Sequence, residues 1–515
     1  TAFCDILVIG SGPAGLQAAL TAARSGARVI LADEDFALGG RLNAEAMEIA
    51  RTPAAQWAQH AVAELSAMAN VRLLPRTTVF ASYDSGTYAA LEKVTDHLAS
   101  PPGHLPRQIL WRIVAKRAIL AAGAIERPIA FANNDRPGVM LAGAVRAYVN
   151  RWSVSPGKST VVFTCNNDGW LTARDLIGAG CAVEAVVDSR PAEEISALRG
   201  MTGDVPVFSR AKIVNAKGGR ELEAVTILNA NGKQVTLEAD CLAVSGGWNP
   251  AVHLTCHRRS QPVWNDTIAA FVPGDLPPGM LVAGAANGAF STHAALVQGG
   301  EAAAKALAEL GIKEGRSAVP DSEDAPYGIS PLWHVGESKG RAWLDFQNDV
   351  TVKDVVQSRE EGFRSVEHMK RYTTLGMATD QGKTSNVPAL AVMAELTGKT
   401  IAQTGTTIFR PPYTPVAISA FTGRAMGREY RPFRLTPSHD WAKENGASFT
   451  EAGLWLRAEW YTAKGESNWR QSCDREALAV RNSVGVADVS TLGKIDVKGR
   501  DARRFLDRIY TNTMS

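Results

Sequence analysis

The fold of this chain is decided by residues 5–34, DILVIGSGPAGLQAALTAARSGARVILADE. The apolar run at 5–9 predicts a short buried strand, and GSGPAG at 10–15 predicts a tight turn that leads into an alanine-rich helix. Gly26 ends that helix, and the apolar run at 27–32 predicts a second strand. This order of strand, glycine turn, helix and strand is typical of a Rossmann-type α/β domain.

The glycines of the turn predict a dinucleotide site, because each has a separate physical role. Gly10 permits the tight bend, Gly12 lets a pyrophosphate approach the backbone, and Gly15 lets helix and strand pack closely. Phosphates are favoured at the positive N-terminus of the following helix. Asp33 lies about 20 residues further on, where a carboxylate that holds a ribose hydroxyl is expected. A tight turn without a ligand is the alternative, but it does not account for Asp33.

Composition excludes several function classes. The 515 residues are 45% hydrophobic and 21% charged, with a net charge of +3, which is too small to indicate nucleic acid or an anionic membrane surface as a partner. We expect no membrane span, because the sequence has no run of 18 apolar residues, and no secretory leader, so we expect a cytoplasmic protein. The first and last residues suggest a piece of a longer polypeptide.

The six cysteines predict buried thiols in a reducing compartment. None forms C-x-x-C with another, so we expect neither a redox-active dithiol nor a cysteine metal site, and no metal ligand is predicted. The cysteines are Cys4, Cys165, Cys181, Cys241, Cys256 and Cys473.

Three later segments predict that the chain returns to the first nucleotide unit. Each is an apolar strand followed by a glycine-rich turn: RAILAAGAIERP (117–128), LAVSGGWNP (242–250) and MLVAGAANGAF (280–290). The same order occurs in two-dinucleotide-domain proteins similar to disulfide reductases. We therefore predict a two-half FAD/NAD(P)-binding Rossmann-like domain over residues 1–325.

Residues 158–250 predict the second half of this domain, in a degenerate form. A strand, a helix and a strand ending near Asp188 repeat the first pattern. The connecting turn at 166–170, NNDGW, has one glycine where a phosphate loop needs three, and Trp170 would crowd a pyrophosphate. We favour a half retained for structure, with a weak nucleotide site as the alternative.

Two further regions follow the nucleotide domain. The polar stretch at 311–328 reads as a linker, and a small domain is predicted at 335–405. A turn-rich second linker at 410–434 leads to residues 435–515, which alternate short helices and strands.

Several long stretches resemble the alpha subunits of heterotetrameric sarcosine oxidases. The resemblance covers essentially the whole chain in the right order, and it is carried by RTTVFASYD (76–84), ERPIAFANNDRPGVMLAGAVRAYVNR (126–151), SVEHMKRYTTLGMATDQGKTSNV (365–387), GTTIFRPPYTPV (405–416) and ADVSTLGKIDVKG (487–499). In that family a domain resembling 2Fe–2S ferredoxins comes first and an aminomethyltransferase-like domain comes last. By this resemblance the chain lacks the former, and residues 435–515 are the N-terminal part of the latter, a folate-binding fold similar to glycine-cleavage T-protein. The residues expected to contact folate then lie beyond Ser515.

The small domain resembles bacterioferritin-associated-ferredoxin-like (BFD-like) domains, whose relatives hold an iron–sulfur cluster with four cysteines. The matching positions here are Asp345, Gln347, Asp380 and Ser385. Because such clusters need thiolate ligands, we predict no Fe–S cluster. The resemblance suggests that the polar loop of Gln381, Gly382, Lys383 and Thr384 faces FMN at a subunit interface. A remnant loop that caps a helix is the alternative.

The resemblance implies that the first Rossmann half holds NAD, and an acid at the end of the second strand suits NAD or FAD better than NADP. The residues implied as NAD contacts are Gly10, Gly12, Ala14, Gly15, Asp33, Glu34, Arg41, Val79, Ala285, Phe290 and Thr292. Two positions depart from the family pattern: Asp35 replaces a basic residue, and Arg41 replaces a common threonine. Other cofactors follow from the family: FMN between the alpha and beta subunits, FAD in the beta subunit, and tetrahydrofolate in the last domain.

The implied reaction is oxidative demethylation of sarcosine to glycine, with reduction of O2 to H2O2. The one-carbon unit passes to tetrahydrofolate, giving 5,10-methylenetetrahydrofolate, or leaves as formaldehyde. Beta, gamma and delta subunits are the implied partners. A subunit that oxidises opines, N-methylglutamate or another secondary amine is one alternative, and a non-catalytic NAD-binding scaffold is another.

No catalytic residue can be assigned from the sequence. The histidines form no metal or general-base motif, and packing or surface roles are favoured for His60, His253, His257, His293 and His334.

Overall fold

The computed structural model describes residues 1–315 and 317–514. The chain forms two compact units, Thr1–Ala420 and Phe421–Ser515, and each is described by itself.

The first half of the larger unit is built on a seven-stranded sheet with the order β5-β2-β1-β8-β7-β6, in which β21 also pairs with β8. β5, β2, β1, β8 and β21 run parallel to one another, while β7 pairs antiparallel with both β8 and β6. The bounds are β1 (Ala2–Ile9), β2 (Val29–Ala32), β5 (Val71–Leu74), β6 (Thr77–Ser82), β7 (Thr87–Lys93), β8 (Gln108–Leu120) and β21 (Met280–Val282).

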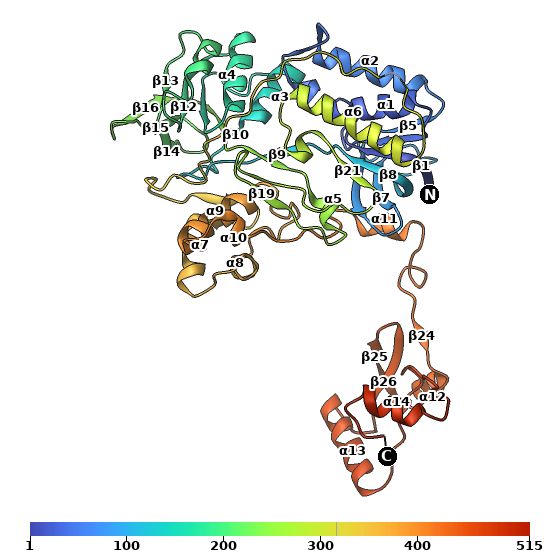
Figure 1. The fold of residues 1–515 in the computed structure, drawn as a ribbon. Helices are drawn as coiled ribbons and strands as arrows, with labels where there is room; N and C mark the ends of the chain where they lie inside the picture. Colours follow the sequence, from blue (N-terminus) through green and yellow to red (C-terminus); the bar gives the residue numbers. More distant parts are fainter. Residues whose placement is uncertain (316, 515) are drawn as a thin grey trace. The chain divides into compact units, whose positions relative to one another are not determined.

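Three helices cover one face of this sheet: α1 (Pro13–Arg24), α2 (Ala54–Ala67) and α6 (Thr292–Glu309). α1 and α6 lie side by side (Figure 1). Small side chains make this close packing possible, because most buried positions of α1 are alanines or glycines. The shorter elements around these helices are η1 (Gly40–Ala44), β3 (Glu48–Ile49), β4 (Thr52–Pro53) and η3 (Gly284–Asn287).

The second half repeats the α/β layering with a parallel sheet of order β10-β17-β11-β12-β13. Side chains of β11 alternate between two cores: Val162 packs with α3 and α4, whereas Val161 and Phe163 pack with the antiparallel sheet β14-β15-β16. The bounds are β10 (Val139–Leu141), α3 (Ala142–Trp152), β11 (Thr160–Thr164), α4 (Asp168–Gly178), β12 (Val183–Asp188), η2 (Ser196–Met201), β13 (Val207–Phe208), β14 (Lys212–Lys217), β15 (Ala224–Leu228), β16 (Gln234–Glu238) and β17 (Cys241–Ser245).

Two short antiparallel strands join the halves, β9 (Ala124–Glu126) and β18 (Trp248–Pro250). α5 (His253–Cys256) and the pair β19 (Val263–Asn265) and β20 (Ala270–Val272) follow them.

A small helical module completes the larger unit. Its elements are β22 (Trp343–Asp345), β23 (Val350–Thr351), α7 (Val352–Glu360), α8 (Val366–Thr373), α9 (Asn386–Thr397) and α10 (Ile401–Thr404). Its core, which includes Met369 and Leu390, packs against Phe271 of the nucleotide region. The module therefore shares a hydrophobic core with the two-half domain.

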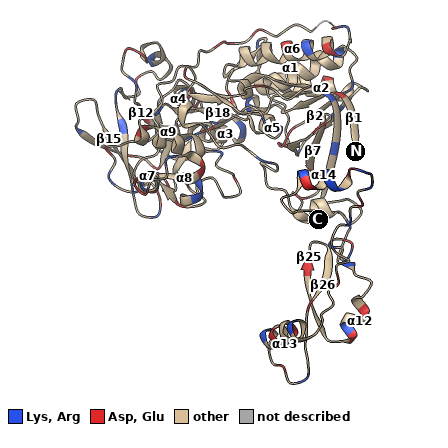
Figure 2. Ribbon diagram, turned by 60° about the horizontal axis from the view of Figure 1, so that its bottom comes forward, with Lys and Arg blue, Asp and Glu red and all other residues tan. Residues whose placement is uncertain are grey.

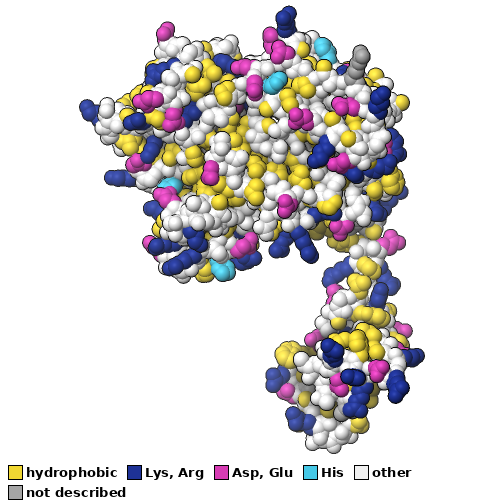
Figure 3. Space-filling model, in the orientation of Figure 1, with side chains coloured by type: hydrophobic (Ala, Val, Ile, Leu, Met, Phe, Trp, Pro, Cys, Tyr) yellow, Lys and Arg dark blue, Asp and Glu magenta, His cyan; other side chains and the backbone are white. Residues whose placement is uncertain are grey.

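The smaller unit has a three-stranded sheet with the order β24-β26-β25. Its elements are β24 (Arg434–Leu435), α12 (His439–Glu444), β25 (Ala447–Ala452), β26 (Trp455–Tyr461), α13 (Trp469–Asn482) and α14 (Ala502–Ile509), and α11 (Ile418–Thr422) spans the division between the units. Large apolar side chains such as Val486, Ile495 and Phe505 are exposed, and hydrophobic groups show on its surface in Figure 3.

The predicted fold class is confirmed: a two-half Rossmann-type α/β domain, a small helical module and an α+β segment. Acidic and basic residues are mixed along the helices, as Figure 2 shows for α6, α13 and α14. The predicted boundaries at 325, 335, 405 and 435 stay predictions.

Candidate dinucleotide site

A cavity of about 420 Å³ lies at the carboxyl ends of β1 and β2, where the glycine turn leads into α1. Parallel α/β sheets bind ligands at this edge. The cavity is walled by the glycine turn, the acidic end of β2, η1, part of β6, the turn at 121–125, the loop at 285–291, and residues of the small module and its C-terminal extension.

The three glycines of the turn differ in what surrounds them. A Cβ at Gly10 would lie 2.3 Å from Ala121 O, and Gly10 has a φ of +98°, so only glycine fits there. A Cβ at Gly15 would lie 1.9 Å from Gly10 O. At Gly12, by contrast, no described atom beyond its immediate neighbours lies within 4 Å of a Cβ position. The backbone at Gly12 is therefore open to the cavity, which fits a diphosphate.

The two acids after β2 have different tasks. Asp33 accepts hydrogen bonds from Ser11 N (2.6 Å), Ser11 Oγ (2.7 Å) and Asp35 N (2.8 Å), so its carboxylate fixes the glycine turn. Glu34 lines the cavity as an exposed side chain. Enclosure by the surrounding protein and the charge of Asp33 raise the pKa of Glu34, while Lys383 and Lys93 act in the opposite direction. Glu34 is thus the more available acceptor for a ribose hydroxyl.

Asp35, which departs from the family pattern, forms a bidentate ion pair with Arg151 of α3, at 2.6 and 2.9 Å. Partial burial opposes ionisation of Asp35, but the hydrogen bonds and charge of Arg151 together with backbone hydrogen bonds from Ala37 and Phe36 lower its pKa. The acid therefore ties the end of β2 to α3.

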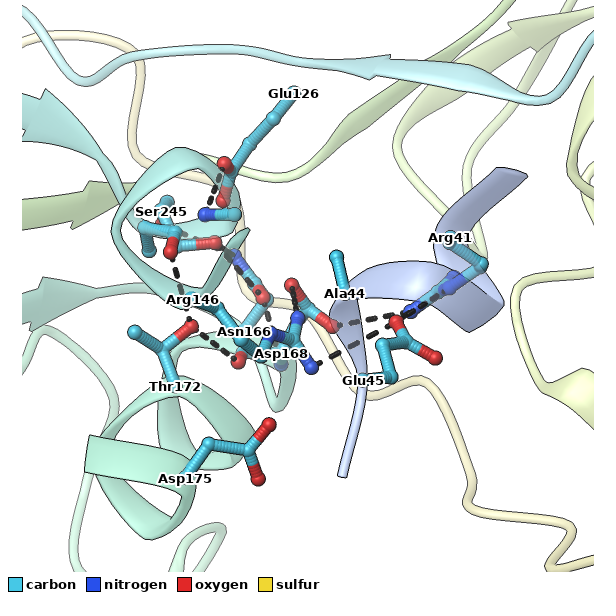
Figure 4. A network of polar contacts seen from close by, with 12 residues as sticks. Arg41, Ala44, Glu45, Glu126, Arg146, Asn166, Asp168, Thr172, Asp175 and Ser245 are labelled. Atoms are coloured by element: carbon cyan, nitrogen blue, oxygen red, sulfur yellow. Dashed lines mark hydrogen bonds and ion pairs between the residues drawn. The ribbon is translucent and has the colours of Figure 1, made fainter. Parts of the chain in front are cut away.

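Arg41, the second departure, belongs to a buried network of charges that spans both Rossmann halves. Arg41 of η1 pairs with Glu45 and lies 3.6 Å from Asp168 of α4, and Arg146 of α3 donates to Asp168 at 2.7 Å. Figure 4 shows both guanidinium groups pointing toward these two carboxylates. Burial would favour the neutral acid at Asp168, but the two arginines outweigh burial and lower its pKa.

Glu126 borders the same network and is buried. Its Oε2 accepts from Gly143 N at 2.7 Å (Figure 4). Burial, followed by the charge of Asp168, raises the pKa of Glu126 to about 8. Glu126 therefore favours its protonated form, unlike Asp168 beside it.

Most of the residues predicted to contact NAD lie around the cavity. Those that line it are Gly10, Gly12, Ala14, Asp33, Glu34, Arg41, Val79, Ala285 and Phe290. Gly15 lies behind the turn and packs against Gly10. Thr292 lines a smaller neighbouring cavity of about 90 Å³ instead, where its hydroxyl lies 3.2 Å from Met47 Sδ.

The residues of the loop predicted to face FMN lie in different surroundings. Lys383 lines the 420 Å³ cavity, Gly382 lines a small cavity behind it, and Thr384 lines a third cavity beside Phe346. Gln381 Nε2 donates to Pro412 O at 2.6 Å.

The lining residues of the 420 Å³ cavity that the sequence did not reveal include Trp248, His253, Tyr413 and Thr414. His253 stacks on Tyr413 with ring centroids 4.3 Å apart, and burial lowers its pKa well below the usual value. The favoured packing role fits this contact, but the cavity position was not foreseen. The LTCHRRS segment offers no motif that would have indicated it.

The glycine-poor turn of the second half is covered by the chain itself. Residues 326–330 cross this turn and are called the covering segment below. Asn167 N donates to Gly328 O, and Asn167 Nδ2 donates to Pro326 O, both at 2.9 Å. Trp170 is fully buried, and its Nε1 donates to Asp188 Oδ2 at 2.8 Å. Arg190 also pairs with Asp188 at 2.8 Å. The covering segment therefore occupies the place beside the turn where a phosphate would bind. Trp170 and Arg190 occupy the carboxylate of Asp188, which would otherwise accept from a ribose hydroxyl.

The four positions that match cluster cysteines lie near one another in the small module. Asp345 Oδ2 accepts from Gly376 N at 2.7 Å, Gln347 Oε1 accepts from Thr379 Oγ1 at 3.2 Å, and Ser385 is buried. Their side chains offer oxygen and amide groups, which do not suit an iron–sulfur cluster. The absence of a cluster stays a prediction that iron and labile-sulfide analysis of purified protein can check.

Within residues 1–315 and 317–514, no group of His, Cys, Asp and Glu side chains is arranged to hold a metal ion. Nor does this part of the chain contain a helix with the length and apolarity needed to cross a membrane.

Comparison with protein families finds three matches: a sarcosine oxidase A3 domain at residues 339–424, a GCVT N-terminal domain at 438–515, and an FAD dependent oxidoreductase at 5–89. The FAD-dependent oxidoreductase match indicates a flavin- or dinucleotide-type fold, and the GCVT match indicates a folate-binding type of domain.

Two curated relatives align with almost the whole length of the chain. The chain is 46% identical to a sarcosine oxidase subunit alpha of Rhizobium meliloti over 99% of its length, and 43% identical to one of Corynebacterium sp. (strain P-1) over 99%. It covers 52% and 54% of these relatives, about half of their length. Among solved structures, an L-proline dehydrogenase from P. horikoshii has a TM-score of 0.65 at 20% identity, covering 81% of this chain and 79% of that one, which shows a shared fold.

Proposed function

Because the chain belongs with the sarcosine oxidase alpha subunits, of which it spans about half the length, we propose that it is the nucleotide-holding part of such a subunit. The observation that carries this proposal is the 46% identity over 99% of the chain. The proposed whole enzyme oxidatively demethylates sarcosine to glycine and reduces O2 to H2O2.

The proposed ligand of the 420 Å³ cavity is NAD. The open backbone at Gly12 and the N-terminus of α1 would receive the diphosphate, and Glu34 would accept from a ribose hydroxyl. Asp33 would act indirectly, because it holds Ser11 and hence the turn. Arg41 and the buried ion pairs would fix the far wall of the cavity.

Amine oxidation is proposed to take place in a partner. FAD of a beta subunit would accept the hydride equivalent from the N-methyl group, and FMN between alpha and beta would pass electrons to oxygen. The loop Gln381–Thr384 is the proposed FMN-facing segment, supported by the resemblance of the small module. Tetrahydrofolate as the one-carbon acceptor is supported by the GCVT-type match at 438–515. Gamma and delta subunits complete the proposed assembly, and a cytoplasmic location is proposed in keeping with six free cysteines.

The proposal is tested by co-expressing this chain, within its full-length subunit, with beta-, gamma- and delta-type partners. The expected result is sarcosine-dependent H2O2, a change from formaldehyde to methylenetetrahydrofolate when tetrahydrofolate is added, and release of NAD on denaturation. Turnover of an opine or N-methylglutamate in place of sarcosine would overturn the substrate. Assembly with no amine turnover would favour the scaffold alternative, and release of FAD from this chain would overturn the NAD assignment.

A further inference from the structure

Lys383 has a fixed position in the lining of the nucleotide cavity. Its Nζ donates to Tyr413 O at 3.0 Å and to Asp380 O at 3.2 Å, and it lies 4.0 Å from the centroid of the Tyr413 ring. Tyr413 is itself held by stacking on His253. The ammonium group is thus anchored by protein carbonyls and a ring rather than by a carboxylate.

The anchored ammonium shares the cavity with Glu34. Both side chains line it, together with the open backbone at Gly12. The charged groups that act on Glu34 are Asp33 and Asp35, which oppose its ionisation, and Lys383 and Lys93, which favour it. Lys93 is an exposed residue at the end of β7, whereas Lys383 is half-buried, so water screens Lys383 less.

We infer that Lys383 is a positioning residue of the dinucleotide site: its anchored ammonium lines the same cavity as Glu34 and supports that side chain as the acceptor of a ribose hydroxyl. This inference rests on the proposed NAD site. It assigns to NAD a residue that the family resemblance places opposite FMN. The small module thereby supplies part of the nucleotide site, and bound nucleotide links that module to the first Rossmann half.

A carboxylate is a stronger acceptor than a carboxylic acid, because hydrogen bonds to charged groups are shorter and stronger. The pKa of Glu34 is raised by its surroundings, and loss of Lys383 removes a group that opposes this rise. Without Lys383, Glu34 takes up its proton at higher pH, and NAD affinity falls earlier as the solution is acidified.

The experiment measures NAD affinity of the purified chain between about pH 5 and pH 8 for the wild type, Lys383→Gln and Lys383→Arg. Lys399→Gln is the matched control, because Lys399 is an exposed lysine of the same module. We expect Lys383→Gln to bind NAD like the wild type at about pH 8, where Glu34 is a carboxylate in both proteins. Once acidification protonates Glu34 in the variant first, the variant should bind roughly tenfold more weakly than the wild type, about the value of one hydrogen bond to a charged group. Its loss of affinity on acidification should begin at higher pH than in the wild type. Lys383→Arg should restore most of the affinity, and Lys399→Gln should bind like the wild type.

An unchanged affinity and pH profile in Lys383→Gln would overturn the inference while leaving the NAD site intact. If the wild type itself binds no NAD, the proposed function fails instead. FMN content of the co-expressed complex provides the third comparison: loss of FMN with retention of NAD in Lys383→Gln would return Lys383 to the flavin. Thermal melting of each variant identifies a general folding defect. If Lys383→Gln melts early, Lys383→Arg, which keeps the positive charge, shows whether the loss of affinity comes from the lost charge or from the folding defect.

Discussion

At the residue scale, the glycine turn separates the positions that the fold requires from one that it leaves open. Gly10 and Gly15 are required by backbone contacts with Ala121 and with each other, whereas the space beside Gly12 is open. The sequence predicted the backbone roles of Gly10 and Gly15, because the motif constrains the backbone directly; that Gly12 receives a diphosphate stays a prediction. It also predicted an acid at Asp33, but not that Ser11 would occupy its carboxylate, since that contact depends on the turn geometry.

Two alanine substitutions should separate these roles. Gly12→Ala should change the free energy of unfolding by only about 1 kcal/mol, since Gly12 is a helix N-cap with ordinary dihedrals. It should lower NAD affinity tenfold or more, because the methyl group would enter the space for the diphosphate. Gly15→Ala should destabilise the fold by roughly 3 kcal/mol, because its Cβ would overlap Gly10 O. Calorimetric NAD titration and denaturant unfolding check both, and wild-type affinity in Gly12→Ala would show that the diphosphate lies elsewhere.

Glu126 gives a prediction about pH. Its folded pKa, about 8, lies above the value of roughly 4.3 for an exposed glutamate, so the folded state binds the proton more tightly. The protonated Glu126 therefore adds to the free energy of unfolding in full below about pH 4, and this contribution is lost as pH rises toward 8. Its size is roughly 1.4 kcal/mol for each unit by which the pKa is raised.

The isosteric variant Glu126→Gln should remove this dependence. Melting temperatures of the two proteins should be similar near pH 5 and should diverge toward pH 8, with the variant more stable. A wild type that loses no stability relative to the variant over this range would show that Glu126 ionises normally.

At the element scale, the second Rossmann half has the α/β layers of the first, but its turn is covered by residues 326–330. The sequence predicted the strand–helix–strand pattern, because apolar periodicity records the core. It indicated a degenerate turn from the single glycine and Trp170. The covering segment could not be foreseen, because Pro326 and Gly328 lie about 160 residues from the turn and carry no recognisable signal.

The occupied turn predicts one dinucleotide per chain. Trp170→Ala should cost about 3–5 kcal/mol of stability, since a fully buried indole is removed. It should not create a second site, because Arg190 and the covering segment remain in place. Titration with NAD should give a stoichiometry near one for both proteins. A second binding event in either protein would show that the covering segment moves aside.

At the scale of the whole molecule, the two units predict how a protease would divide the chain. The sequence predicted a linker at 410–434, and Arg424 and Arg428 are exposed there. Brief trypsin treatment should cut at these arginines first and leave a fragment that ends near Ala420 and contains every residue lining the 420 Å³ cavity. That fragment should retain NAD, as mass spectrometry and nucleotide release can show. Early cleavage within residues 1–320 would contradict this division.

The buried ion pairs have a consequence for motion within the larger unit. Arg41 of the first half lies 3.6 Å from Asp168 of the second, and Arg146 of the second lies 3.7 Å from Glu45 of the first. Asp35 and Arg151 join the halves again at the edge of the cavity. To swivel one half against the other about β9 and β18, the protein would have to separate desolvated charges, at a cost of several kcal/mol. The halves should therefore behave as a single rigid frame, so that the distances between groups held by the two halves stay fixed and do not change by domain rotation.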